Sequence, residues 1–123
     1  MHYYGHGGEV GWAEERVLEL NDINSWDNYN NLPVFVTATC EFSRYDDAQR
    51  ASAGEQVLLN PEGAGIALFT TTRTITEDDA KNLSRSFYKY ALPESVGEVL
   101  TFGQLIRSMK MILTLQVFQR LTS

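Results

Sequence analysis

The strongest constraint on the fold is an uncharged segment near the end of the first third of the chain. The segment Pro33-Val34-Phe35-Val36-Thr37-Ala38-Thr39 is rich in β-branched residues, and this composition predicts a strand buried on both faces, as in a parallel sheet. Residues 65–72 have the same character and end before Arg73. Because helical patterns separate these runs, the sequence predicts an α/β sandwich with a mostly parallel sheet.

Capping residues and apolar spacing predict the helices. A Ser or Thr at the start of a helix accepts a hydrogen bond from a backbone amide of the first turn, and an acidic or amide side chain three residues later returns the bond. Ser52 opens a helix to about Leu59, Thr76 with Asp79 one to about Leu92, and Thr101 with Gln104 a last one whose apolar stripe reaches Leu113. Asn21 or Asp22 caps a shorter helix that ends at Asp27 or Tyr29, and 60–63 and Pro93 act as breaks.

Composition and charge limit the classes of function. A chain of 123 residues with 43% hydrophobic residues suits one globular domain. The net charge of −6, with Lys and Arg scattered, argues against a nucleic-acid partner, since a phosphate backbone needs a basic surface. No apolar run approaches the roughly 20 residues that span a bilayer, and residues 1–4 do not resemble a signal peptide.

Two reactive residues follow predicted strands. Residues 1–4 are predicted to be the end of a strand that runs into the glycine-rich segment Gly5–Gly11, which we predict to be a loop and which contains His6. The only cysteine, Cys40, follows the strand at 33–39. The carboxyl ends of parallel strands form the ligand-binding edge of such sheets. An imidazole beside a thiol favours the thiolate and can carry a proton to a leaving amine. The sequence therefore predicts a cysteine nucleophile, Cys40, with His6 as its general base and acid.

Other residues complete this hypothesis. The backbone amides of Gly7 and Cys40 are predicted to form an oxyanion hole. Arg73 and Trp12 are candidate substrate contacts, although for Trp12 a place in the core is the preferred interpretation.

Several alternatives to this chemistry remain open. Glu9 and Glu41 are each candidates to orient His6, with a solvent-facing carboxylate as the alternative for both. A buried structural role is the alternative for Cys40, and a loop residue without function is the alternative for His6.

Metal binding is the third alternative. Zinc ligands would have to come from a loose set, and we predict no metal and no cofactor. Calcium at two neighbouring carboxylates is an open possibility, but a surface charge cluster is the simpler interpretation. The residues concerned are His2, His6, Glu9, Cys40, Asp46 and Asp47 for zinc, Asp46 with Asp47 for calcium, and Arg44 as the third member of the charge cluster.

At these residues the chain resembles a known family. Tyr4-Gly5-His6-Gly7-Gly8 and Thr37-Ala38-Thr39-Cys40-Glu41-Phe42-Ser43-Arg44 are similar to the catalytic region of the gingipain family of caspase-like cysteine peptidases. Supporting segments are Gly11-Trp12-Ala13-Glu14-Glu15-Arg16, Ser52-Ala53-Gly54-Glu55 and Thr70-Thr71-Thr72-Arg73. The resemblance runs from about Tyr3 to Lys110 and is greatest to the sortases of the type IX secretion system.

The resemblance implies a function and a location. His6 matches the family's catalytic histidine, Cys40 its nucleophile, and Gly7 with Cys40 its oxyanion-hole amides. Sortase-like members cleave a C-terminal secretion signal from cargo proteins at the outer membrane and transfer the acyl group to an amine of lipopolysaccharide. The resemblance also implies other components of the secretion system as partners. The alternatives are a hydrolytic gingipain-like protease and an inactive fragment or binding module that holds cargo without cleaving it.

The chain departs from the family pattern at both ends. Family members have an amino-terminal subdomain, whereas this chain begins at the histidine segment. Residues 111–123 do not have the sequence that is typical of the family at this point. We therefore expect residues 1–123 to be a partial caspase-like domain, the carboxyl-terminal part of the three-layer catalytic sandwich.

Overall fold

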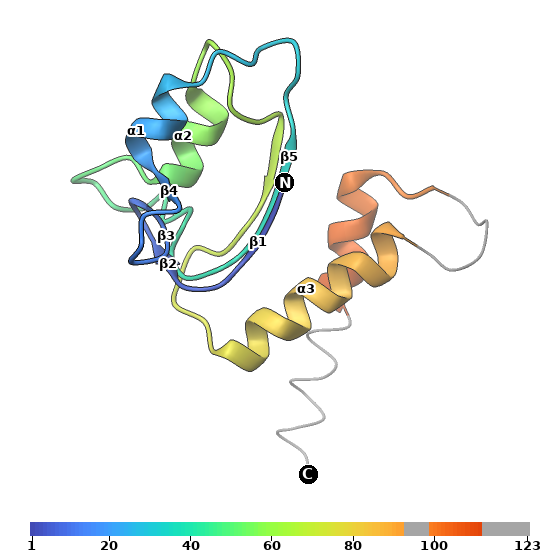
Figure 1. Ribbon diagram of the computed structural model, residues 1–123. Helices are drawn as coiled ribbons and strands as arrows, with labels where there is room; N and C mark the ends of the chain where they lie inside the picture. The colour runs from blue at the N-terminus through green and yellow to red at the C-terminus, as the bar shows by residue number, and fades with distance from the viewer. Residues whose placement is uncertain (93–98, 112–123) are drawn as a thin grey trace. The chain divides into compact units, whose positions relative to one another are not determined.

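The structure is a computed structural model that describes residues 1–92 and 99–111. The chain divides into two compact units, Met1–Ala80 and Lys81–Ser123. The first unit contains a parallel sheet with the strand order β1-β5-β6 (Figure 1). These strands are β1 (His2–Tyr4), β5 (Val34–Ala38) and β6 (Ala67–Phe69). The α/β class with a parallel sheet is therefore confirmed.

The central strand is the uncharged segment that dominates the sequence. In β5, Phe35 and Thr37 are 0% exposed, and Val36 and Ala38 are also buried, so both faces of the strand are covered as predicted. Strand β6 is shorter than the predicted 65–72. Its threonines leave the sheet because Thr71 bonds to the segment after β5: its hydroxyl donates to the carbonyl of Thr39, and its carbonyl accepts from the amide of Ser43.

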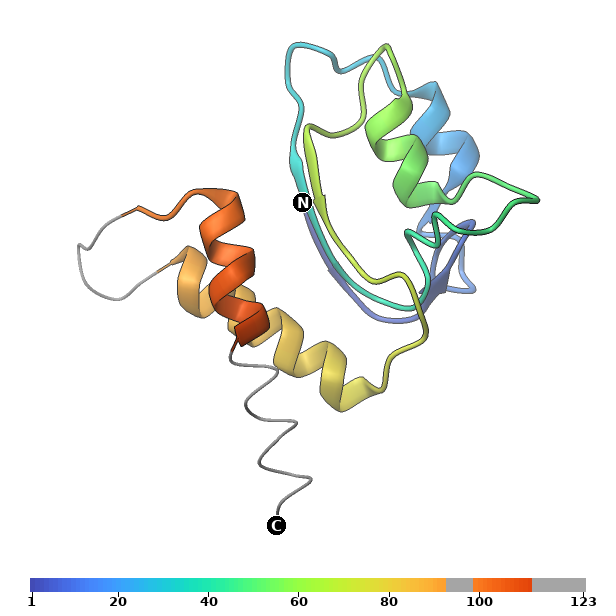
Figure 2. The same ribbon diagram turned by 180° about the vertical axis from the view of Figure 1, so that it is seen from behind.

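Two helices pack against each other on one side of this sheet, α1 (Leu20–Ser25) and α2 (Ala53–Leu59) (Figures 1 and 2). Helix α2 starts where predicted, because Ser52 and Glu55 form a reciprocal capping box. Helix α1 starts and ends earlier than predicted. Its cap is Glu19, whose amide donates to the Asp22 carboxylate over 2.8 Å.

The core of the first unit is aromatic. The ring of Trp12 stacks on Tyr3 with centroids 4.4 Å apart and lies against Phe35 and Phe42 at 6.1 and 5.6 Å. Burial of such rings is the main contribution to the stability of a small domain. Other members of the core cluster are Leu18, Ile23, Ala53, Val57 and Ala64.

The glycine-rich segment forms a second small sheet, so our prediction of a loop over Gly5–Gly11 was wrong. The antiparallel order is β2-β3-β4, with strands β2 (Gly7–Gly8), β3 (Gly11–Trp12) and β4 (Leu18–Glu19). Glycine is rare in strands, but here it permits close pairing. A Cβ at Gly11 would overlap the carbonyl oxygen of Leu18. The hairpin β2-β3 fixes the backbone just after His6.

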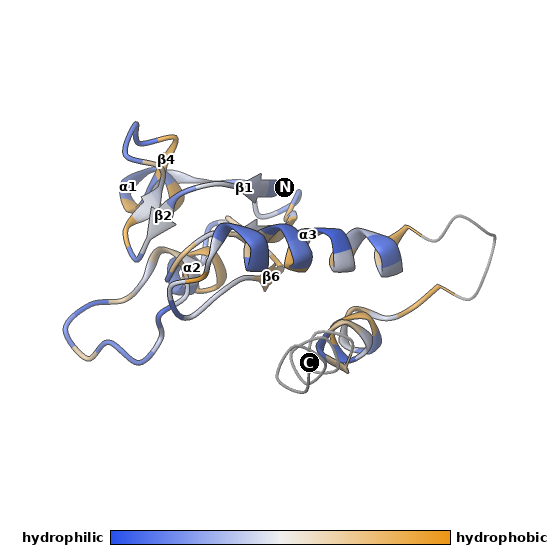
Figure 3. Ribbon diagram, turned by 90° about the horizontal axis from the view of Figure 1, so that it is seen from below, coloured by the Kyte–Doolittle hydropathy of each residue, from blue (hydrophilic) through white to orange (hydrophobic). Residues whose placement is uncertain are grey.

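Helix α3 (Glu77–Ala91) begins at the predicted cap, where Thr76 and Asp79 exchange hydrogen bonds. Figure 3 shows that α3 is largely hydrophilic. Residues 102–111 are helical, as predicted, and Thr101 bonds with Gln104 at the start of this segment. Within the second unit, the Phe87 and Phe102 rings meet edge to face. The predicted extension to Leu113 lies outside the described residues, and no helix within them is long and apolar enough to cross a bilayer.

Candidate active site

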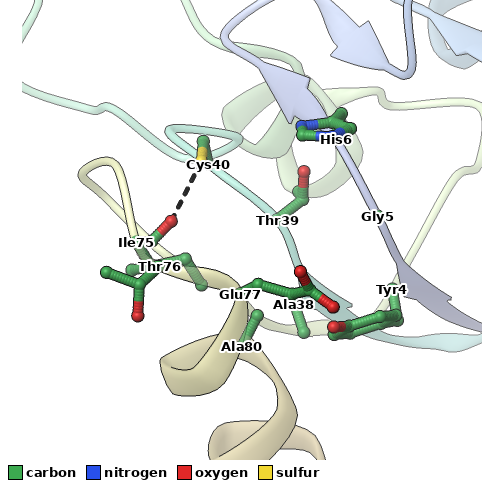
Figure 4. Close-up of a pocket in the computed structure, with 10 residues that line it drawn as sticks. All are labelled: Tyr4, Gly5, His6, Ala38, Thr39, Cys40, Ile75, Thr76, Glu77 and Ala80. Atoms are coloured by element: carbon green, nitrogen blue, oxygen red, sulfur yellow. Dashed lines mark hydrogen bonds between the residues drawn. The ribbon is translucent and has the colours of Figure 1, made fainter.

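The two predicted reactive residues line one cavity of about 320 Å³ at the carboxyl edge of the parallel sheet (Figure 4). His6 follows β1 and Cys40 follows β5, the neighbouring strand. The cavity is lined by Tyr4, Gly5, His6, Ala38, Thr39, Cys40, Ile75, Thr76, Glu77 and Ala80. The strand-edge rule placed His6 and Cys40 at the same edge of the sheet, and both residues line this cavity.

Three backbone-directed bonds fix the position of the histidine segment. The Tyr3 hydroxyl donates to the carbonyl of His6 over 2.7 Å, and the amide of Ala13 donates to the same oxygen over 2.8 Å. The amide of Gly5 donates to the carbonyl of Ala38 over 3.4 Å, which links the segment to β5. Burial, and to a smaller extent the negative charge of Glu15, raise the pKa of Tyr3 above its ordinary value.

The cysteine lies at a sharp change of direction. Cys40 comes two residues after β5, and the next residue, Glu41, has a φ of 49°, a left-handed conformation that non-glycine residues seldom adopt. The amide of Glu41 donates to the carbonyl of Arg73 over 3.3 Å. The Cys40 thiol is half-buried, and its Sγ lies 3.7 Å from the carbonyl oxygen of Ile75 as a weak donor. The thiol therefore faces the cavity wall formed by the segment after β6.

The predicted oxyanion-hole donors are the backbone amides of Gly7 and Cys40. Ala13 donates to His6, so these two residues form a hydrogen-bonded pair of the hairpin, and the next pair in register, Gly7 with Trp12, is a non-bonded one. The amide of Gly7 consequently points away from β3. The amide of Cys40 donates to no residue in the described part of the chain. Gly7 lines a different cavity from the one that Cys40 lines, so the structure does not bring the two predicted oxyanion-hole residues to one cavity.

The two carboxylates considered as partners of His6 are instead paired with an arginine. Arg44 Nη1 lies 2.9 Å from Glu9 Oε1 and 3.4 Å from Glu41 Oε1. The Glu9 side chain is only 14% exposed, and Arg50 approaches it at 3.9 Å. Arg44 therefore links the tip of the histidine hairpin to the loop that follows the cysteine. The interpretation of Arg44 as a member of a surface cluster with Asp46 and Asp47 missed this long-range link.

The two candidate substrate contacts lie elsewhere. Arg73 is paired with Asp46 through two bonds of 2.9 and 2.5 Å, and its side chain is 58% exposed and does not line the cavity. The Arg73 guanidinium lowers the pKa of Asp46, and the Asp46 carboxylate raises the pKa of Arg73. Trp12 is 5% exposed and belongs to the core, as the preferred interpretation predicted.

Sequence reasoning missed four residues of the cavity wall and one polar group. Ile75, Thr76, Glu77 and Ala80 come from the segment that follows β6. The strand-edge rule applied to this strand indicated Arg73 instead, because the strand was predicted to extend to residue 72 and ends at Phe69. The polar group is the hydroxyl of Thr39, which is buried without a hydrogen-bond partner among the described residues. The sequence could not have identified this hydroxyl, because a threonine in a strand rich in β-branched residues is common and does not reveal whether its hydroxyl has a partner.

A second cavity, of about 420 Å³, lies along the small sheet and shares only His6 with the first. Its wall includes the charged side chains of Glu14, Arg16 and Glu19. His6 therefore contacts two separate spaces, one with the thiol and one without it.

No group of three metal-ligating side chains occurs within the described residues. His2, one of the candidate zinc ligands, has its pKa lowered by burial and by the nearby N-terminal ammonium. Asp47, a candidate calcium ligand, has its pKa lowered first by the backbone amide of Gln49, which donates to it over 2.8 Å. The carboxylates of Glu9, Glu41, Asp46 and Asp47 are thus engaged with cations and amides of the protein itself.

The comparison with protein families agrees with this geometry. Residues 1–121 match the model of peptidase family C25. Searches of curated proteins and of solved structures gave no significant match. The family match covers nearly the whole chain and includes His6, Cys40 and the strands that place them. The chain has the α/β caspase-like fold and belongs to peptidase family C25, the gingipain family of cysteine peptidases.

Proposed function

We propose that this chain carries the catalytic pair of a cysteine endopeptidase, with Cys40 as the nucleophile and His6 as its general base and acid. The observation that carries the proposal is the single cavity that both side chains line. The amide of Cys40 supports it, because this amide has no backbone acceptor among the described residues and an oxyanion needs donors that are not already bonded within the protein. Such a donor is typically worth about 3 kcal/mol in the transition state.

The reaction follows from these groups. His6 takes the proton of the Cys40 thiol, and the thiolate attacks the carbonyl carbon of a peptide bond. The oxyanion of the tetrahedral intermediate accepts hydrogen bonds from the amides of Gly7 and Cys40. When the C–N bond breaks, the proton on His6 goes to the leaving amine, and a thioester with Cys40 remains. An amine or a water molecule then attacks the thioester, and His6 takes the proton of that nucleophile.

We further propose that the acceptor is an amine, as in the type IX secretion sortase PorU. The sequence resemblance supports this proposal, and it implies cargo with a C-terminal secretion signal, lipopolysaccharide as the amine-bearing acceptor and a site of action at the outer membrane. The second cavity is compatible with transfer: the proton carrier must contact both amines, and His6 is the residue that lines both cavities.

Product analysis tests both proposals. The full chain is incubated with a peptide that ends in a type IX secretion signal, with and without a primary amine in excess, and the products are identified by mass. We expect an amide of the amine, and we expect Cys40→Ala to abolish every product. A free carboxylic acid as the only product would support the hydrolytic alternative. Binding of the peptide without cleavage would support the binding module.

A further inference from the structure

The Thr39 side chain is an exception to the pairing of buried polar groups. Thr39 is 1% exposed, and its Oγ1 has no hydrogen-bond partner among the described residues. The neighbouring Thr37 shows the ordinary arrangement, because its buried hydroxyl bonds to Thr70 Oγ1 at 2.6 Å. A buried hydroxyl without a partner lowers stability, and in native proteins such groups often have a functional role.

The hydroxyl of Thr39 lies at the candidate active site. Thr39 lines the cavity beside Cys40, and Figure 4 shows its hydroxyl directed toward the side of the cavity where His6 lies. A Cβ added to Gly7, the residue after His6, would overlap Thr39 Oγ1. The free hydroxyl therefore contacts the histidine segment itself.

A catalytic imidazole requires a partner that holds its ring in one orientation. The two carboxylates nearest in sequence to the pair, Glu9 and Glu41, are engaged by Arg44 and leave this role open. A threonine hydroxyl can accept a hydrogen bond from an imidazole N–H in both protonation states of the ring.

We propose that the Thr39 hydroxyl is a positioning group for His6, which accepts a hydrogen bond from its imidazole when the ring turns toward Cys40. The inference rests on the proposed function, since it assigns the orienting partner of the proposed base. It explains why a hydroxyl without a structural partner occupies this position.

The test replaces the hydroxyl by a methyl group of similar size, Thr39→Val, with Thr39→Ser as the variant that retains the hydroxyl and Thr37→Val as the matched control. Thermal unfolding, imidazole NMR resonances and alkylation of Cys40 are measured for each. The chain has two histidines, so His2 serves as an internal reference in the spectra. We expect Thr39→Val to unfold no earlier than the parent chain, because it removes an unpaired group, whereas Thr37→Val unfolds earlier.

Thr39→Val should also shift the His6 resonances and lower the His6-dependent alkylation rate by about three- to ten-fold, the equivalent of one hydrogen bond. Thr39→Ser should restore both. Unchanged His6 resonances in Thr39→Val would overturn the proposal, as would destabilisation equal to that of Thr37→Val with no effect on His6. If alkylation in the parent chain is independent of His6, the proposed function fails, and the His6 resonances still decide the role of Thr39.

Discussion

The loop after Cys40 has two flanks that use the same chemistry differently. On the inner flank, Arg44 pairs with Glu9, whose side chain is 14% exposed, and so connects the loop to the histidine hairpin. On the outer flank, Arg73 pairs with Asp46, and both side chains are about half exposed, at 58% and 46%. The outer pair has the shorter distance, 2.5 Å against 2.9 Å, yet water screens it more strongly. Burial and the segments joined, rather than distance, therefore indicate which pair matters to the site.

Removal of each arginine in turn tests this difference between the two flanks, and it is expected to have the largest effect. Arg44→Met leaves the Glu9 carboxylate in a mostly buried place, where Arg50, at 3.9 Å, is the remaining cation paired with it among the described residues. We expect a loss of about 1–2 kcal/mol in the free energy of unfolding, because an unpaired charge is costly where water is partly excluded. Denaturant titration measures it. Arg73→Met is the matched control and should show a much smaller loss; equal losses would contradict the distinction between the flanks.

A second test changes the contact between the histidine hairpin and Thr39 without changing any charge. Gly7→Ala adds a Cβ that would overlap Thr39 Oγ1 and lie 3.0 Å from the carbonyl oxygen of Gly11. Overpacking of this kind costs about 1–3 kcal/mol, and the hairpin should move away from Cys40. In the control Gly8→Ala, the added Cβ meets no atom within 4 Å. Thermal unfolding and Cys40 alkylation of the two variants should differ clearly, and similar values would show that the contact with Thr39 is unimportant.

The smallest effect is expected on the outer flank and depends on pH. Arg73 lowers the pKa of Asp46 in the folded chain. The pair therefore stabilises the fold above the pKa of Asp46 in the unfolded chain, and this contribution is lost as the pH falls through the lower, folded value. Asp46→Asn should be slightly less stable than the parent chain at neutral pH and equal to it in strong acid. A difference that grows on acidification would contradict this sign.

The predictable parts of the fold depend on local signals. Ser52, Thr76 and Thr101 each begin a helix as predicted, because a cap satisfies amides within its own first turn. The start of α1 was missed because Glu19, a side chain outside the preferred capping set, caps it. The strands β2 and β3 were missed because glycines seldom form strands.

The candidate site likewise has features that the sequence predicts and features that it does not. The shared cavity of His6 and Cys40 followed from the rule that ligands bind at the carboxyl edge of a parallel sheet. The partner of Arg44 did not, since Glu9 is 35 residues away in the sequence and no local pattern links them. The free hydroxyl of Thr39 is also visible only in three dimensions, because burial and the absence of a partner depend on the packing around it.

The central claim is that His6 and Cys40 act as a pair, and the rate of Cys40 alkylation by iodoacetamide as a function of pH tests it most directly. The folded chain is compared with His6→Ala between about pH 5 and pH 10. We expect the parent chain to be alkylated faster than His6→Ala at pH values below the ordinary thiol pKa of about 8.5, because an imidazole beside the thiol favours the thiolate. Identical profiles for the two proteins, or a rate at every pH equal to that of the denatured chain, would contradict it.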